Sequence, residues 1–126
     1  MARVLYSVTM SLDGFIAGPG GDMSWLTPHL GPDPVVEALM GRVGSLLVGH
    51  RTFTGDDPHR GTESEGKPFG GAWDGPQFVL THHVPATAAA GTTFLDDLQA
   101  AVTAARIVAG DRYVDVLGAE VARRCL

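Results

Sequence analysis

The sequence is poor in cysteine and in basic side chains, and it contains no long apolar run. Its single cysteine, Cys125, has no partner for an internal disulfide or for a zinc-binding CxxC pair, so we interpret it as a small buried hydrophobic residue. Nine scattered Lys and Arg residues stand against fourteen Asp and Glu, which gives a formal charge of −5. Because nucleic acids attract clustered positive charge, this balance argues against nucleic-acid binding, and it makes a membrane-surface role a poor hypothesis.

Targeting and metal-binding patterns are also missing. No segment approaches the roughly 18 apolar residues that a membrane-spanning helix requires, and the N-terminus lacks the pattern of a secretory signal. We therefore expect a cytoplasmic protein. The five histidines show no ligand spacing and no HExxH-type motif, so we expect no metal site.

Glycine and proline, by contrast, are abundant, with 17 Gly and 8 Pro among 126 residues. They indicate that much of the chain forms turns and loops. The chain is long enough to bury one hydrophobic core, and it has no internal repeat. We therefore expect a single domain, residues 1–126.

Apolar patterning predicts alternating strands and helices. Runs of β-branched and apolar residues predict strands at residues 4–10, 15–17, 45–49, 77–81 and 113–117. Asp33 before Pro34 predicts the N-cap of a helix that runs to a stop at Gly44. A second helix is expected over residues 95–105, capped by Thr92 or Thr93, and a third over residues 118–126. This alternation predicts an α/β fold with a largely parallel sheet flanked by helices.

Two segments do not fit a routine domain. Residues 55–75 lack any periodicity, and a loop of that length is usually functional or disordered. The last helix stops at Leu126 without a cap or a polar tail, so we expect the chain to be a C-terminally truncated form.

Three predicted strands end in small, hydroxyl-bearing or imidazole residues. The first of these strand ends suits a phosphate group, because it offers a backbone N–H without a side chain, two possible cations and a hydroxyl. These groups belong to Gly49, His50, Arg51 and Thr52. Thr81 and His82 follow the next strand, and Gly118 and Ala119 follow the last one. Each of these motifs alone also fits an ordinary exposed loop or helix start. Together, at the carboxyl ends of parallel strands, they predict an anion-binding site.

A fourth motif, S-L-D-G at residues 11–14, follows the first strand. Taken alone it is best interpreted as a β-turn, because Asp-Gly is common in turns. Extended to S-L-D-G-F-I-A and combined with Trp25, the G-x-R-T at residues 49–52 and the D-D-P at residues 56–58, it resembles the dihydrofolate-reductase-like superfamily. The D-D-P segment is similar to that of the reductase domain of bifunctional riboflavin deaminase-reductases. The resemblance covers essentially the whole chain in order, and it implies a fold of that type whose C-terminal strands are missing here.

The resemblance implies a bound NADPH across the carboxyl ends of the strands. Thr9 and Trp25 would line the nicotinamide, and Gly49, Thr52 and Asp56 would hold the ribose and phosphates. Thr81 and His82 would lie near the adenosine phosphate. The pyrophosphate would be wrapped by the last strand end, at Leu117, Gly118, Ala119, Glu120 and Val121. Here Leu117 replaces the first of two glycines that are usual in the family, and a branched side chain restricts the backbone.

The expected function is NADPH-dependent reduction of a pyrimidine- or pteridine-like heterocycle, at a C–N or C–O bond of a heterocyclic or sugar substrate. The chain thereby resembles 5-amino-6-(5-phosphoribosylamino)uracil reductase, and the family implies a homodimer. Met40 stands where one arginine for the substrate phosphate would fall. Asp13 is the nearest carboxylate to the expected reaction centre, and a buried carboxyl can deliver a proton there; a turn-forming role is the alternative.

Three other functions stay open at this stage. The chain could be a nucleotide-binding or assembly module without turnover, or a dihydrofolate-reductase-like enzyme with another substrate. It could also be a small domain with no nucleotide role, in which the glycine-rich strand ends are ordinary turns.

Overall fold

A computed structural model describes residues 1–126, and its contacts divide the chain into two compact units. The first unit comprises Met1–Ser7, Arg42–Thr54 and Gly75–Leu126 and contains every strand. The second unit comprises Val8–Gly41 and Gly55–Asp74 and consists of loops and short helices. Each unit is therefore built from segments that are far apart in the sequence.

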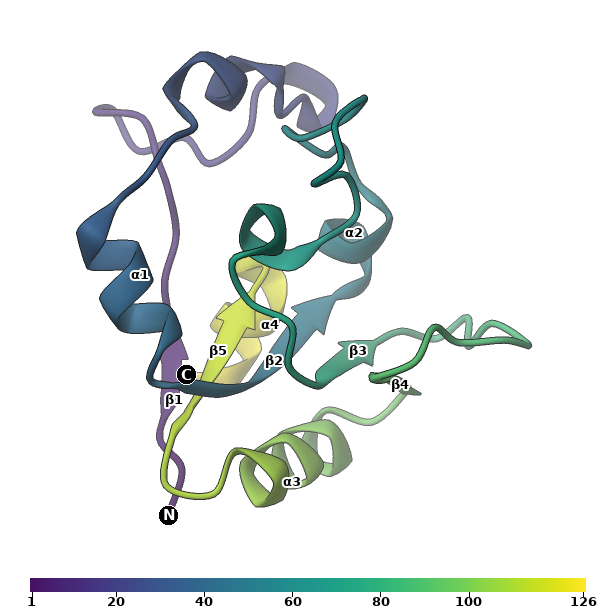
Figure 1. Ribbon diagram of the computed structural model, residues 1–126. Helices are drawn as coiled ribbons and strands as arrows, with labels where there is room; N and C mark the ends of the chain where they lie inside the picture. Colours follow the sequence, from purple (N-terminus) through teal and green to yellow (C-terminus); the bar gives the residue numbers. More distant parts are fainter. The chain divides into compact units, whose positions relative to one another are not determined.

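The first unit is organised around a five-stranded sheet. Its strands are β1 (Val4–Tyr6), β2 (Val43–Gly49), β3 (Gln77–Leu80), β4 (Thr92–Leu95) and β5 (Tyr113–Leu117). Their order is β1-β5-β2-β3-β4, and all four pairings are parallel. Figure 1 shows β5 between β1 and β2. The α/β class with a parallel sheet, which the sequence predicts, is thus confirmed.

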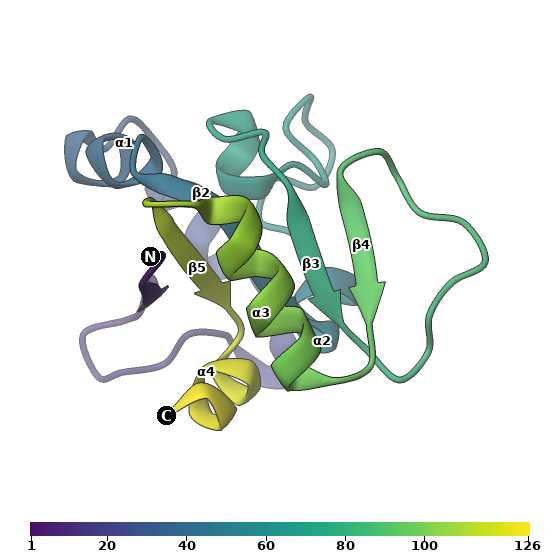
Figure 2. The same cartoon turned by 90° about the horizontal axis from the view of Figure 1, so that it is seen from below.

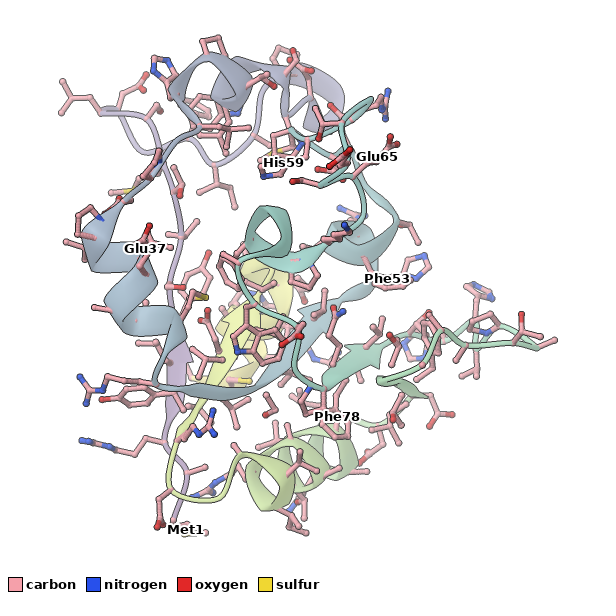
Figure 3. All side chains as sticks on the ribbon, viewed as in Figure 1. Met1, Glu37, Phe53, His59, Glu65 and Phe78 are labelled. Carbon is pink, nitrogen blue, oxygen red and sulfur yellow. The ribbon has the colours of Figure 1, made fainter.

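Helix α3 (Leu98–Ala109) covers one face of this sheet (Figure 2). Its buried residues are all alanines, Ala101, Ala105 and Ala109, and these small side chains let the helix lie close to the strands. The facing strand residues are larger, and Figure 3 shows Phe78 on the side of the sheet that faces α3. Asp97 caps the helix by accepting a hydrogen bond from the Ala100 N–H at 2.7 Å.

Two short helices follow strands of the same unit. Helix α2 (His50–Thr54) follows β2, and α4 (Ala119–Cys125) follows β5. The predicted last helix is thereby confirmed. None of the helices of the structure is both long and apolar enough to cross a bilayer.

The second unit contains helix α1 (Pro34–Met40) and three short 3-10 helices, Pro19–Gly21, Ser24–His29 and Pro68–Gly71. Asp33 caps α1 by accepting hydrogen bonds from the N–H groups of Val35 and Val36, which confirms the predicted N-cap.

The long loop of the second unit is held by its own bonds. The Asp57 carboxylate accepts from the N–H groups of His59 at 2.8 Å and Gly66 at 2.6 Å, and the Glu65 carboxylate accepts from the Gly61 N–H. Figure 3 shows His59 and Glu65 on this loop.

The structure corrects the predicted end of the first helix. The helix ends at Met40, and Gly44 lies inside β2, at a register shift opposite β5. A Cβ at Gly44 would lie 2.7 Å from the carbonyl oxygen of Ala109, so glycine is required for close packing rather than for a helix stop. The first strand also ends at Tyr6, and residues 15–17 form no strand.

The predicted caps of the second helix are wrong as well. Thr92 and Thr93 belong to β4, an edge strand that the sequence did not predict, and the helix begins only at Leu98. The physical reason is that β-branched and aromatic residues favour a strand, whereas Asp97 offers a stronger N-cap.

Candidate functional site

The carboxyl ends of three neighbouring strands form the centre of the candidate site. β2 pairs with β3 through Gly49 and Leu80 and with β5 through Val48 and Leu117. Because all three strands run parallel, the residues that follow them lie at the same edge of the sheet. The structure therefore brings together the chain at residues 49–52, 81–82 and 117–121.

Gly118 makes the closest approach between two of these strand ends. Its φ is +114°, and a Cβ there would lie 2.8 Å from the Thr52 hydroxyl oxygen and 3.6 Å from the Gly49 backbone. A Cβ at Gly49 would lie 3.1 Å from the Val121 side chain, which belongs to the buried core. Glycine is therefore required at Gly118 by both its conformation and its surroundings.

Leu117 itself lies in ordinary strand conformation. It is the last residue of β5 and is half-buried, and its φ is not in the left-handed region. A branched side chain is compatible with strand geometry. The substitution of a glycine by Leu117, relative to the family pattern, consequently costs no backbone strain.

The β2 and β3 ends are joined by a side-chain hydrogen bond. The buried Thr81 hydroxyl lies 2.9 Å from Nδ1 of His50 and accepts a hydrogen bond from the His83 N–H at 3.1 Å. Since the Thr81 oxygen already accepts from His83, its own hydrogen is suited to donation to Nδ1. In the tautomer in which Thr81 donates to Nδ1, Nε2 of the exposed His50 carries the ring hydrogen and is a hydrogen-bond donor. His82, beside it, is exposed.

Charged side chains lie along α4, with Glu120 in its first turn and Arg123 and Arg124 in its last turn. The Glu120 carboxylate pairs with Arg123 at 2.7 Å, and the hydrogen bond from Arg123 lowers the pKa of Glu120, assisted by the charges of Arg124 and Arg51. Glu120 is thus ionised and engaged by Arg123. Ala119 and Arg51 are exposed at this end of the unit.

The remaining predicted site residues, Thr9, Trp25 and Asp56, belong to the second unit. Thr9 is exposed, and the indole N–H of Trp25 is buried without a hydrogen-bond partner. The Asp56 carboxylate accepts from the Met23 N–H at 2.9 Å and forms an ion pair with Arg60 at 2.6 Å. The Met23 hydrogen bond is the main cause that lowers the pKa of Asp56.

Asp13 is not the buried carboxyl that was expected. It is exposed and accepts a hydrogen bond from the Ser11 hydroxyl at 2.7 Å, inside a turn closed by the Gly14 N–H and the Ser11 carbonyl. The turn-forming interpretation describes this geometry. Cys125 is exposed rather than buried, and partial desolvation raises the pKa of its thiol. A raised pKa makes a thiol a poorer nucleophile at neutral pH.

The sequence analysis missed the one carboxylate of the first unit that is fully buried. Asp115 lies in the middle of β5 and is 0% exposed. The Ser7 hydroxyl donates to its two oxygens, each at 3.0 Å. Burial raises the pKa of Asp115 to about 6, against the opposing effect of the Ser7 hydrogen bonds. The sequence did contain a signal for it, a charged residue inside an otherwise apolar predicted strand. Burying such a group costs folding free energy, so its presence indicates a specific role.

Comparison with known proteins identifies a family and a similar solved structure. The family model of the RibD C-terminal domain matches residues 2–114. A solved structure of a protein assigned to riboflavin biosynthesis, from Shewanella sp. PV-4, is similar with a TM-score of 0.61 and 25% sequence identity. That similarity covers 97% of this chain and 67% of the Shewanella chain. No curated protein matches the sequence.

Proposed function

The chain belongs to the RibD C-terminal domain family, and from that premise we propose that it is an NADPH-dependent reductase acting on a pyrimidine- or pteridine-like heterocycle. The convergence of the β2, β3 and β5 ends carries the proposal. The similar Shewanella protein, assigned to riboflavin biosynthesis, supports a substrate from that class of chemistry.

The residues at the strand ends fit a dinucleotide. Gly49 and Gly118 expose backbone that a phosphate can approach closely, and Thr52 adds a hydroxyl beside Gly118. His50 offers its second ring nitrogen, Nε2, and Arg51 offers a guanidinium to the same edge of the sheet. These groups would hold the phosphates and ribose, and Val121 would contribute through its backbone because its side chain lies in the core.

The second unit contains a buried hydrogen-bond donor without a partner. A buried N–H without a partner is unusual in a folded protein, and Trp25 has such a group. A ligand that accepts this hydrogen bond would satisfy it. Bound NADPH would supply the hydride, so the protein's task is to position the two reactants and to exclude water.

Titration calorimetry with NADPH tests the proposal. Wild type is expected to bind in about the micromolar range, and Thr52→Ala is expected to weaken binding about tenfold because one hydrogen bond to a charged group is lost. Thr54→Ala is the matched control: Thr54 lies on the same short helix, but its hydroxyl donates to the His50 carbonyl at 2.9 Å. Binding by Thr54→Ala should equal that of wild type.

Turnover is tested with two probe substrates, 5-amino-6-(5-phosphoribosylamino)uracil and dihydrofolate, by the loss of absorbance of the reduced nicotinamide. Oxidation that requires one of these probes supports a reductase. Binding without any oxidation favours a nucleotide-binding module instead. A folded wild-type chain that does not bind NADPH at all contradicts the proposal.

A further inference from the structure

Asp115 and Ser7 form an isolated polar pair inside an apolar sheet. Asp115 is 0% exposed, and its in-register neighbours are Leu5 on β1 and Leu46 on β2. The Ser7 hydroxyl bonds to both carboxylate oxygens at 3.0 Å. An apolar residue of similar size could be buried here at a lower cost in folding free energy, because an ionised carboxyl loses its hydration on burial.

No cation compensates for the buried carboxyl. The effects on the pKa of Asp115 are burial, the Ser7 side chain and the backbone groups of Ser7 and Val116, and none is a charged side chain. Most charged groups on or beside the elements packed against β5 have other partners: Arg3 and Arg42 lie over the Tyr113 ring, Arg42 also donates to the Tyr113 hydroxyl, Arg106 donates to the Ala2 carbonyl, and Glu120 pairs with Arg123. Arg124 of α4 is exposed and is not among the groups that shift the pKa of Asp115. A carboxyl in such surroundings favours its protonated form.

Ser7 connects this buried carboxyl to the candidate site. It directly follows β1, whose last residue Tyr6 pairs with Val116, so the next position along β5 is Leu117. Ser7 therefore lies at the same carboxyl edge as the β2, β3 and β5 ends. It is half-buried, whereas Asp115 has no exposed surface. Of the two residues, only Ser7 therefore has surface open to a small molecule at this edge.

We propose that Ser7 and Asp115 deliver the proton for the reduction, with Asp115 holding the proton and Ser7 passing it to the substrate. This inference rests on the proposed reductase function. Asp115 acts only through Ser7 and is a positioning and proton-holding residue, whereas Ser7 touches the substrate.

The transfer balances in protons and charge. When Asp115 is protonated, its O–H donates to the Ser7 oxygen, and the Ser7 hydrogen is free to point toward the substrate. A bound reduced nicotinamide would supply the hydride to the substrate carbon, and Ser7 would give its hydrogen to the neighbouring substrate nitrogen or oxygen. Ser7 is restored by the Asp115 proton in the same movement. Asp115 is left as a carboxylate that solvent reprotonates through the same hydroxyl.

The first test measures the carboxyl itself, without any turnover. In the full chain with 13C-labelled aspartate, the Asp115 signal, assigned by its loss in Asp115→Asn, is expected to titrate at about pH 6. Ser7→Ala should raise that midpoint, because the hydrogen bond from Ser7 favours the ionised form. An Asp115 carboxyl that stays ionised down to about pH 4, near its ordinary range, overturns the proposal.

The second test is the pH profile of kcat. In wild type, kcat should fall as pH rises above about 6, because the proton-holding form is lost. Asp115→Asn and Ser7→Ala should each lower kcat by about a hundredfold or more and flatten the profile, while the Kd for NADPH stays unchanged. Ser7→Thr keeps a hydroxyl and should recover most of the activity.

Ser45→Ala provides a matched control. Ser45 is also a buried serine of this sheet, but its hydroxyl donates to the Ala105 carbonyl at 2.8 Å. Its removal should leave kcat and the pH profile as in wild type.

The outcomes separate the two proposals. If wild type does not oxidise NADPH with a heterocyclic probe, the reductase function fails and the proton pair fails with it. If wild type is active and Ser7→Ala keeps its kcat and pH profile, the proton pair alone is refuted. Ser7→Ala keeps this decision possible even if Asp115→Asn does not fold.

Discussion

Replacing Asp115 by Asn should change how the stability of the protein depends on pH. Asn has nearly the same shape and can still accept a hydrogen bond from Ser7, but it carries no titratable proton. The buried carboxyl has a pKa of about 6 in the folded chain, against an ordinary value of 3.8. The folded state therefore binds more protons than the unfolded state between these two values.

The direction of the effect follows from this proton uptake. Wild type has the full stabilising contribution of the protonated carboxyl below about pH 3.8, and it loses this contribution as pH rises through about 6. A shift from 3.8 to about 6 corresponds to about 3 kcal/mol, at about 1.4 kcal/mol per pH unit. Between about pH 4.5 and 7.5, wild type should lose about 2 kcal/mol relative to Asp115→Asn.

Urea unfolding of both proteins at the two pH values measures this difference. Other titrating groups affect both proteins alike, so only the difference between their free energies of unfolding matters. Asp111→Asn is a suitable control: Asp111 is fully exposed, and its pair with the N-terminal ammonium is a surface contact. If the free energies of unfolding of wild type and Asp115→Asn differ by the same amount at both pH values, the assignment of a buried proton to Asp115 is refuted.

Two further predictions concern the stability of local structure. Asp33→Ala removes the cap of α1 and should lower the free energy of unfolding by about 1 kcal/mol, measured by urea unfolding; an unchanged midpoint would show that the cap contributes nothing. Gly44→Ala places a Cβ 2.7 Å from the Ala109 carbonyl oxygen and should cost about 1–3 kcal/mol, whereas Gly31→Ala, where a Cβ meets no atom within 4 Å, should cost much less. Equal thermal midpoints for the two glycine variants would contradict this difference.

Much of the fold could be predicted because several signals are local. The β-branched and aromatic residues of Tyr113–Leu117 predict the strand with the observed bounds, and Asp33 before Pro34 predicts the observed helix start. The misplaced stop at Gly44 had a different cause. That glycine is required by the backbone of Ala109, and a contact across such a sequence distance leaves no trace in the local pattern.

The candidate site was likewise predictable only where it depends on local sequence patterns. The strand ends around Gly49 and Gly118 were predictable, because a parallel sheet places its carboxyl ends at one edge. The pairing of Asp115 with Ser7 was not, because the two residues are 108 positions apart. Only the insertion of β5 beside β1 brings them together.

That insertion also constrains how the chain can be made. Of the five strands described, β1 is synthesised before the others, yet its only neighbour in the sheet is β5, which is synthesised after them. Until Tyr113–Leu117 emerges, the first strand has no partner, and the Ser7 hydroxyl has no carboxylate to bind. The sheet can therefore be completed only after β5 has been synthesised, and a nascent chain halted before β5 would expose an unpaired edge to association with other chains.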